Sequence, residues 1–496
     1  MARCFEFLVG PRLNLPHVKG IERSEDMLNP VTPTFEAQLR AVLPVSAFRD
    51  PAPYLSEPRG RWAGQGLVVA PSDTAEVVAV VKACARARIG IVPYSGGTGL
   101  VGGQTIADGP APVILSLDRM TRIHDVYPTE NVLICDAGAI LADVQVAAAN
   151  VDRLFALSLA SEGSARIGGV LSTNAGGVNV LRYGNARAQC LGLEVVRPDG
   201  SVWNGLSRLR KDNTGYDLRD LFIGAEGTLG VITKAALKLM PRPTRQGTAL
   251  FAVSSPQAAL ELLGLAGQFV GDGLSAFELI HQQGFAFLAE VGPAVKMPLE
   301  NLPEWSVLID VGLADGLSPE TALTSLFEAA LSGGLVSDGV IASSDAQRRA
   351  LWHIRESIPE ANRRIGSISS HDISVPLSMI PAFIEQAGGA LAQLGRYRIN
   401  CFGHLGDGNL HYNVFPLPGK NRNDHEADRA VIKTCVHDLV HKMDGSVSAE
   451  HGIGRLKVDD LQRYGDPEKL VMMRAIKAAL DPDGIMNPNA VLPRVN

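Results

Sequence analysis

The pattern of apolar and polar positions in the first half of the chain predicts short strands separated by few helices. Asp73-Thr74-Ala75-Glu76 has the form of a capping box and predicts a helix that runs to about Arg88. Short apolar runs bounded by Gly, Pro or Asp predict strands on both sides of this helix. Strands are expected at 66–70, 89–94, 113–117 and 132–137, with a hairpin at 193–203, a closing segment at 227–239, and helices at 33–43 and 140–150.

The pattern changes after Pro241-Arg242-Pro243, which is the best candidate for a domain boundary. Beyond this point strand patterns alternate with longer helical patterns. This predicts an α+β domain with a mainly antiparallel sheet covered by helices. Strands are expected at 249–253, 306–312, 371–376, 399–403 and 410–415, and helices at 256–268, 319–331, 345–364, 378–394, 425–443 and 467–480.

Composition excludes several classes of protein. A chain of 496 residues is long enough for two or more domains with a large core. The net charge is −6 and basic residues are scattered, which argues against a nucleic-acid binder. No apolar run approaches the ~18–20 residues of a membrane span. The first 30 residues lack the apolar stretch and cleavage pattern of a secretory signal, and their acidic residues argue against a transit peptide.

The six cysteines are far apart in the sequence and none forms a CxxC pair. This spacing supports neither an iron–sulfur cluster nor a thiol redox motif. We expect buried free thiols in a reducing compartment, which is the cytoplasm, or the mitochondrial matrix if the source is eukaryotic.

Gly97, Gly99 and Gly102 form a literal GxGxxG after a predicted strand, which is the pattern of nicotinamide-dinucleotide sites. That fingerprint needs a helix whose N-terminus faces the pyrophosphate. Residues 103–112 contain two Gly and two Pro and cannot form several helical turns. A phosphate at this loop would therefore be bound by backbone amides alone.

Three segments, 95–103, 161–177 and 224–230, combine Gly with Ser, Thr or Asn and carry few charges. If these loops converge, their backbone amides can wrap a long and mostly neutral cofactor. The alternative is a set of tight turns in a β-rich domain without a ligand.

The segment Gly403–Asn413, GHLGDGNLHYN, places His404 and His411 on either side of a Gly-Asp-Gly turn. Such a turn can fold the chain back and bring both imidazoles to one side. Glu450 and His451 follow some forty residues later. Two His and one Glu are a plausible ligand set for a divalent metal with an open position, which leaves His451 for proton transfer. Spacing alone leaves open whether Glu450 is the base and His451 a ligand, or whether all are ordinary turn residues.

Several motifs together resemble a known family. The segment Pro93–Gly103 (PYSGGTGLVGG) is similar to the pyrophosphate loop of the vanillyl-alcohol-oxidase (PCMH) type of FAD-binding fold. The motifs SEGS at 161–164, IGG at 167–169, TNAGG at 173–177, RYG at 182–184, DNTGYD at 212–217 and GAEGTLGVIT at 224–233 resemble the rest of its FAD domain. GHLGDGNLHYNV, SAEHGIG and DPDGIMNPN (481–489) resemble the C-terminal domain of FAD-linked D-lactate and D-2-hydroxyglutarate dehydrogenases.

The resemblance implies noncovalent FAD bound between two α+β subdomains, a capping substrate domain, and oxidation of a D-2-hydroxy acid to the 2-oxo acid. The implied domains are an N-terminal segment (1–60), the FAD-binding domain (61–242), the substrate domain with the metal site (243–455), and a C-terminal segment (456–496) that returns to the FAD domain. The residues implied in FAD binding are Ser95, Gly96, Gly97, Thr98, Gly99, Gly102, Ser161, Glu162, Gly163, Gly168, Thr173, Asn174, Gly176, Gly177, Tyr183, Gly184, Glu226, Gly227, Gly230, Ile232, Asn409 and Asn487.

The family also implies roles in the second half. His404, His411 and Glu450 match the zinc ligands, His451 the base, and Arg355 the residue that binds the substrate carboxylate; Asn413 matches a further site residue. Chemically, we expect the metal to lower the pKa of the substrate hydroxyl, His451 to take the proton, and the hydride to pass to flavin N5. Arg355 is expected to bind the carboxylate in bidentate geometry.

One position departs from the family. D-2-hydroxyglutarate enzymes tend to carry Lys where this chain has Ser370, so a second substrate carboxylate lacks an obvious ammonium partner, unless Arg363 or Arg364 compensates. Two rival functions are a metal-free flavin oxidase of a carbohydrate or phenolic alcohol, and a FAD-carrying electron-relay subunit. The expected electron acceptor is electron-transfer flavoprotein or a quinone, and a homodimer is expected from base rates alone.

Overall fold

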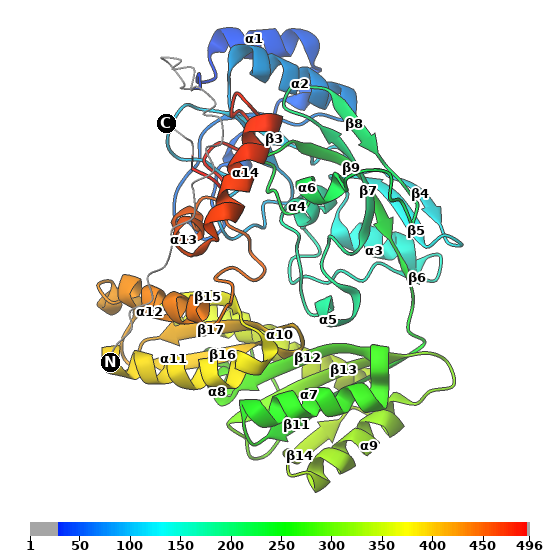
Figure 1. The fold of residues 1–496 in the computed structure, drawn as a ribbon, viewed down its shortest axis with the longest axis vertical. Coiled ribbons are helices and arrows are strands. Elements are labelled where there is room, and N and C mark those ends of the chain that lie inside the picture. The colour runs from blue at the N-terminus through cyan, green and yellow to red at the C-terminus, as the bar shows by residue number, and fades with distance from the viewer. Residues whose placement is uncertain (1–27, 494–496) are drawn as a thin grey trace, which may run out of the picture.

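The computed structural model describes residues 28–493 and contains two halves, with the C-terminal helices returning to the first (Figure 1). The predicted segment 1–60 therefore lies partly outside the described residues. Among residues 28–493, no helix is long and apolar enough to cross a membrane. The five cysteines in this range are free, and four of them are buried.

The first half begins with a small parallel sheet. Its strands β1 (Leu67–Val69), β3 (Val113–Ser116) and β2 (Ile91–Tyr94) pair in that order. Helix α1 (Pro33–Val42) and helix α2 (Thr74–Ala87) cover it (Figure 1). The side chain of Asp73 caps α2 by accepting the Glu76 N–H, as the capping pattern predicts.

A five-stranded antiparallel sheet forms the rest of this half, with order β4-β5-β9-β7-β8. The expected hairpin at 193–203 is present as β7 and β8. The elements are β4 (Ile123–Tyr127), β5 (Val132–Asp136), β7 (Cys190–Val196), β8 (Val202–Gly205), β9 (Val231–Lys238), α3 (Leu141–Ala149), α4 (Ile167–Ser172), α5 (Val180–Tyr183) and α6 (Arg219–Phe222). The two-residue strands β6 (Arg153–Leu154) and β10 (Met240–Pro241) pair beside it.

The second half is a seven-stranded sheet in which every pair of neighbours is antiparallel, with order β14-β11-β13-β12-β16-β17-β15. The α+β prediction is confirmed. The strands are β11 (Arg245–Val253), β12 (Leu274–His281), β13 (Trp305–Leu313), β14 (Val336–Ile341), β15 (Ser369–Ser374), β16 (Arg398–His404) and β17 (Asn409–Phe415). The helices are α7 (Pro256–Val270), α8 (Gln282–Val291), α9 (Pro319–Ser332), α10 (Asp345–Ile365), α11 (Ile380–Leu394) and α12 (Arg429–Lys442).

The two faces of this sheet differ because side chains alternate along each strand. One face packs Phe251, Phe277, Ile309 and Tyr412 into the apolar core under α7, α9, α11 and α12. The other face carries apolar residues under α8 and α10, and then a row of polar ones. This polar row comprises Asp310, Glu278, His404, His411, Asp372, Asn413 and Asn400, which register places on neighbouring strands.

Several elements escaped the sequence-based prediction. Strands β4, β12 and β14 and helix α8 were not expected, and the helix expected at 425–443 begins only at Arg429, after a 3₁₀ turn. Strand β12 follows the turn-forming Gly271-Asp272-Gly273, and its apolar run continues directly into α8, so periodicity alone did not separate the two elements.

The C-terminal segment joins the two halves. After α12 the chain passes residues 446–456 and forms α13 (Val458–Tyr464) and α14 (Pro467–Leu480) beside the first half (Figure 1). The buried Glu226 carboxylate accepts the Ile453 and Gly454 N–H groups, both at 2.7 Å. The Arg455 guanidinium donates to the carbonyls of Gly102 and Gly103 at 2.9 and 2.8 Å.

We predict that Glu226→Ala lowers the free energy of unfolding by about 2–4 kcal/mol, because two buried backbone N–H groups lose their acceptor. Urea denaturation followed by circular dichroism measures this change. The control is Glu385→Ala on the exposed face of α11, which should change the free energy by less than about 0.5 kcal/mol. Equal stability of the two variants would show that the Glu226 contact does not hold the segment.

Candidate active site and metal centre

The turn between β16 and β17 brings the two predicted histidines together. His404 ends β16, the 3₁₀ turn Leu405–Asp407 follows, and Gly408 closes it in the left-handed region with φ of 86°. In the resulting hairpin Phe402 pairs with His411, and the rings of His404 and His411 lie 5.5 Å apart between centroids. The prediction that this turn gathers both imidazoles on one side is confirmed.

Asp372 on β15 brings the distant segment 449–451 to this hairpin. Its backbone carbonyl accepts the Ala449 N–H, and its carboxylate accepts the N–H groups of Glu450 and His451 at 3.0 and 3.1 Å. Asp372 also pairs with His411 across the strands. A single buried carboxylate therefore positions the residue pair 450–451 beside residue 411.

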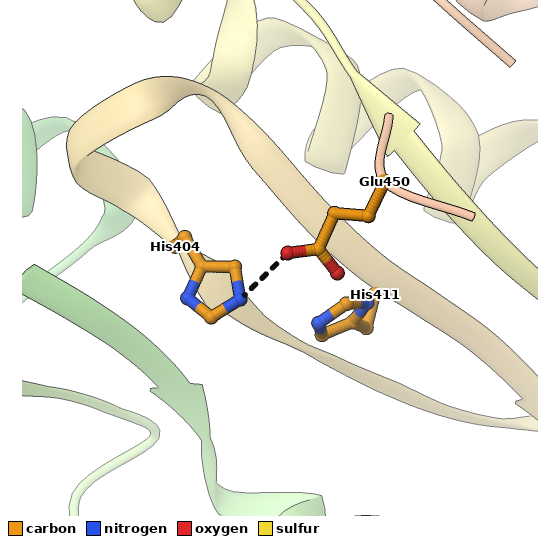
Figure 2. Close-up of side chains that lie close together, drawn as sticks. All are labelled: His404, His411 and Glu450. Carbon is orange, nitrogen blue, oxygen red and sulfur yellow. Dashed lines mark ion pairs between the residues drawn. The ribbon is translucent and has the colours of Figure 1, made fainter. Parts of the chain in front are cut away.

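The three predicted metal ligands form one cluster (Figure 2). One donor atom from each of His404, His411 and Glu450 lies within 4.8 Å of the others, and His404 Nε2 is 3.4 Å from Glu450 Oε1. Bonds of 2.0–2.2 Å to a tetrahedral ion separate two ligand atoms by roughly 3.4 Å, so this spacing suits a shared cation better than a direct hydrogen bond. The donor set fits zinc.

Glu278, on the unexpected strand β12, orients one of the ligands. Its Oε1 lies 2.6 Å from His404 Nδ1, and its Oε2 lies 2.7 Å from Arg355 Nη2. With Nδ1 bonded to a carboxylate, the Nε2 atom of His404 faces the cluster. This carboxylate–histidine arrangement is typical of metal-binding histidines.

The charges in the cluster shift its pKa values in opposite directions. Burial alone would lower the pKa of His404, but Glu278 and Glu450 raise it to about 10. Burial lowers the pKa of His411 to about 4. Burial would raise the pKa of Glu278, yet His404 and Arg355 lower it to about 2. Without a metal, the cluster thus holds a proton on His404. A cation bound by His404 Nε2 and Glu450 would take the place of that positive charge.

His451 is held by the same Asp372. Its Nδ1 lies 3.1 Å from Asp372 Oδ2, which leaves its Nε2 available, and about a third of its side chain is exposed. Asn409 donates to Asp372 Oδ1 at 2.9 Å, so its amide is bound to the seven-stranded sheet. Contact between Asn409 and a cofactor stays a prediction.

Arg355 and Asn413 lie near the cluster of His404, His411 and Glu450. Arg355, on α10, is buried and packs its guanidinium 4.8 Å above the Phe402 ring while Nε and Nη2 bind Glu278. Asn413 is two residues beyond His411 on the same strand face, opposite Ser370 and Asn400. The site residues predicted for the second half therefore share one face of one sheet.

The glycine-rich loop 95–103 has the features of an anion site. No helix follows it, so the literal GxGxxG is not a nicotinamide fingerprint. Gln104 binds the carbonyls of Gly97 and Gly99, and Arg455 binds those of Gly102 and Gly103. Within the described part of the chain, the backbone N–H groups of 96–103 donate no hydrogen bond. The loop carbonyls are bound by side chains, and the loop amides have no partner. The amides are therefore available to donate to a bound pyrophosphate.

The other two loops meet this one. The Gly169 N–H donates to Ser95 Oγ at 3.0 Å, and a Cβ at Gly103 would contact Glu226 at 3.4 Å. Asn487 donates to the Glu226 carbonyl and accepts from Arg455. The loops converge as expected. FAD contacts by the residues of these loops stay predictions, namely those of Ser95, Gly96, Gly97, Thr98, Gly99, Gly102, Ser161, Glu162, Gly163, Gly168, Thr173, Asn174, Gly176, Gly177, Tyr183, Gly184, Glu226, Gly227, Gly230, Ile232 and Asn487.

Tyr183 has a different setting. It lines a cavity of about 570 Å³ between the halves, together with Ser275, Asp310 and Trp352. These residues are not part of the ligand cluster.

Four residues that shape the site were not assigned a role from the sequence: Gln104, Glu278, Asp372 and Arg455. Glu278 and Asp372 are single acidic residues within strands that are otherwise largely apolar or neutral, which is a usable signal. For Gln104 and Arg455 the sequence offers no comparable signal, because their partners are backbone carbonyls distant along the chain.

Comparisons with known proteins agree with this architecture. Residues 66–205 match the family described as FAD binding domain, and residues 242–491 match the family described as FAD linked oxidases, C-terminal domain. The chain is 36% identical over 438 residues to a probable mitochondrial D-2-hydroxyglutarate dehydrogenase of Oryza sativa subsp. indica, covering 88% of this chain and 77% of that protein.

Two further relatives carry related names. A mitochondrial D-2-hydroxyglutarate dehydrogenase of Bos taurus is 35% identical over 463 residues, covering 92% of this chain and 83% of the relative. A putative mitochondrial D-lactate dehydrogenase of Schizosaccharomyces pombe is 34% identical over 433 residues, covering 85% and 81%.

Solved structures share the fold at low identity. p-Cresol methylhydroxylase with bound substrate superposes with a TM-score of 0.71 at 17% identity, covering 94% of this chain and 99% of that one. An alkyldihydroxyacetonephosphate synthase gives 0.70 at 16% identity, covering 95% and 86%. With two domain matches that together span most of residues 66–491, the chain belongs to the family of FAD-linked oxidases.

Proposed function

We propose that this chain is a FAD-dependent dehydrogenase that oxidises a D-2-hydroxy acid, of the D-2-hydroxyglutarate or D-lactate class, to the 2-oxo acid. The observation that carries the proposal is the single sheet face on which His404, His411, Glu450, His451 and Arg355 gather. The names of the relatives support the substrate class.

The proposed reaction needs two groups besides the side chains, a flavin that accepts a hydride and a cation that acidifies a hydroxyl. FAD, which the three glycine-rich loops would hold, would supply the hydride acceptor. A divalent cation, for which zinc fits the donors, would supply the charge that lowers the pKa of a hydroxyl; for water the change is from ~15.7 to about 7. His404, His411 and Glu450 would hold that cation.

His451 acts as the base in this proposal. Asp372 occupies its Nδ1 side, so Nε2 takes the proton of the substrate hydroxyl and the ring becomes an imidazolium beside a carboxylate. Glu450 is bonded to the sheet through its backbone and points at His404, which suits a ligand better than a base. This geometry supports Glu450 as the ligand and His451 as the base.

Arg355 positions the substrate carboxylate. Its Nε–Nη2 edge is already paired with Glu278, so the carboxylate can be bound only by the remaining N–H groups. Bidentate binding of the substrate carboxylate would then use the Nη1–Nη2 edge. Fixing the carboxylate holds C2 in one orientation, which lowers the entropic part of the barrier.

The electron acceptor, whether electron-transfer flavoprotein or a quinone, stays a prediction, as do the homodimer and the cytoplasmic or mitochondrial location. The two rival functions would require different features of the site. Neither a metal-free oxidase nor a relay subunit needs a donor cluster oriented by a buried glutamate.

We predict that His404→Ala, in the FAD-loaded protein, slows flavin reduction by a D-2-hydroxy acid by at least about 100-fold while the flavin stays bound. The reason is that the cation loses the ligand that Glu278 orients. Anaerobic bleaching of the flavin absorbance and elemental analysis of bound metal measure the two effects. The control is His441→Ala on the exposed side of α12. A fully active His404→Ala protein would exclude the metal mechanism.

We further predict that metal uptake releases about one proton at neutral pH. The pKa of His404 is raised to about 10, so a cation must displace its proton at any lower pH. Apparent affinity for Zn²⁺ should then rise about tenfold for each pH unit between 6 and 8, because His411 has already lost its proton there. Competition with a chromophoric chelator measures this slope, and an affinity independent of pH would contradict it.

A further inference from the structure

Helix α5 is a part of the first half that reaches the second half next to the candidate site (Figure 1). The first half holds this short helix at both ends. The Asn179 side chain, just before α5, donates to the Ala156 carbonyl at 2.9 Å. Gly184, just after α5, has φ of 72°, and its carbonyl accepts the Gln189 side-chain amide at 2.9 Å. The position of α5 is therefore set by the first half.

Two neighbouring side chains of α5 contact the second half directly. Leu181 belongs to the first half by sequence, but it packs against the apolar core of the second half. The Arg182 guanidinium donates to the Gly312 carbonyl at 2.7 Å and to Ser275 Oγ at 3.1 Å. These contacts place α5 against the start of β12, the end of β13 and the 3₁₀ turn after β16.

Two glycines of the second half allow this close approach. A Cβ added at Gly406 would meet Leu181 Cδ2 at 2.6 Å, and a Cβ added at Gly312 would meet Arg182 Nη1 at 2.7 Å. Favourable contacts between non-bonded carbon atoms have separations of roughly 3.5–4.0 Å. A larger residue at either glycine would therefore push α5 away from the second half.

The contact between Leu181 and Gly406 lies between the two regions that the proposed reaction must bring together. Gly406 is in the turn that joins the proposed metal ligands His404 and His411. On its other side, α5 follows the glycine-rich segment 161–177, which is predicted to contact FAD. Because a four-residue helix spans only about 6 Å, α5 is a short connection between the predicted flavin loop and the metal turn.

The rate of hydride transfer depends steeply on how these regions are spaced. Reacting atoms must approach to about 3–3.5 Å, and a misplacement of about 1 Å can cost on the order of 100-fold in rate. The cation and Arg355 would hold the substrate on the second half, whereas the glycine-rich loops would hold the flavin on the first. The packing of the two halves therefore sets the distance between hydride donor and acceptor.

We propose that Leu181 is a positioning residue for hydride transfer, and that its contact with Gly406 sets the distance between the substrate on the second half and the flavin on the first. The proposal rests on the proposed function and deepens it. A contact that only stabilised the fold would change the stability of the protein and leave the reduction step of the folded protein unchanged.

The first test is anaerobic flavin reduction by D-lactate and by D-2-hydroxyglutarate in the FAD- and zinc-loaded Leu181→Ala protein. The rate constant at saturating acid should fall by at least about tenfold, while the apparent Kd of the acid changes by less than about twofold. Acid deuterated at C2 should still react more slowly than the protonated acid, because hydride transfer limits the reduction. The control is Leu260→Ala on α7, a partly buried leucine that packs against the same core and should leave the rate constant unchanged.

Two outcomes of this test separate the proposal from the function on which it rests. A rate constant in Leu181→Ala equal to that of the unaltered protein, or a loss confined to the apparent Kd, would overturn the positioning role alone. Flavin of the unaltered protein that neither acid reduces would overturn the proposed function as well.

The second test is a double-mutant cycle with Gly406→Ala. Gly406 lies outside the left-handed region, so alanine adds a methyl group without backbone strain. In the single variant this methyl group displaces Leu181 and should slow reduction. In Leu181→Ala/Gly406→Ala the methyl group occupies space that the shortened side chain leaves. The double variant should therefore reduce its flavin faster than Gly406→Ala does.

The same coupling should appear without the cofactors. In urea denaturation of the four proteins free of FAD and zinc, the double variant should have a higher midpoint than Gly406→Ala. Rate effects that multiply and midpoint shifts that add, as for independent sites, would show that the two residues do not act through one contact, and would overturn the proposal.

Discussion

The carboxylate of Asp372 is the contact on which the rest of the site depends. It lies on an inner face of β15 and accepts the backbone N–H groups of Glu450 and His451, while its second oxygen accepts Asn409. A segment that joins the sheet to the C-terminal helices is thereby fixed beside the β16–β17 hairpin. Hydrogen bonds to a buried carboxylate are strong and directional, so the proposed metal ligand Glu450 and the proposed base His451 receive defined positions from one side chain.

A second carboxylate works in the same way on the neighbouring strands. Glu278 binds both His404 and Arg355, so the orientations of the proposed metal ligand and of the proposed carboxylate-binding residue depend on one group. The segment fixed by Asp372 continues to Ile453–Arg455, where Glu226 and the glycine-loop carbonyls hold it to the first half. The His404–His411–Glu450 cluster and the glycine-rich loops are thus joined by one chain of hydrogen bonds.

The sequence predicted the ligand cluster but not the residues that orient it, and the differences have physical reasons. The motifs around His404, His411 and Glu450 predicted the cluster because a Gly-Asp-Gly turn has few possible geometries. The strand β12, and Glu278 with it, was missed because its apolar run continues into α8. Whether Arg355 is free or paired depends on a residue 77 positions away, which local patterns cannot report. Arg363 and Arg364 differ in this respect, because their partner Glu360 lies three and four residues earlier on the same helix, a spacing that could have indicated the pairing.

The most direct measurement is the effect of Asp372→Asn on bound zinc and on flavin reduction in the FAD-loaded protein. The amide keeps one acceptor oxygen in place of two, and its NH2 group must face either the two backbone N–H groups or the Asn409 amide, which are all donors. Segment 449–451 should therefore be held less firmly on the sheet. The account predicts retained yellow flavin, zinc affinity lower by about 10–100-fold, and a comparable or larger loss in the rate of reduction. Zinc content and reduction rate equal to those of the unaltered protein would contradict it.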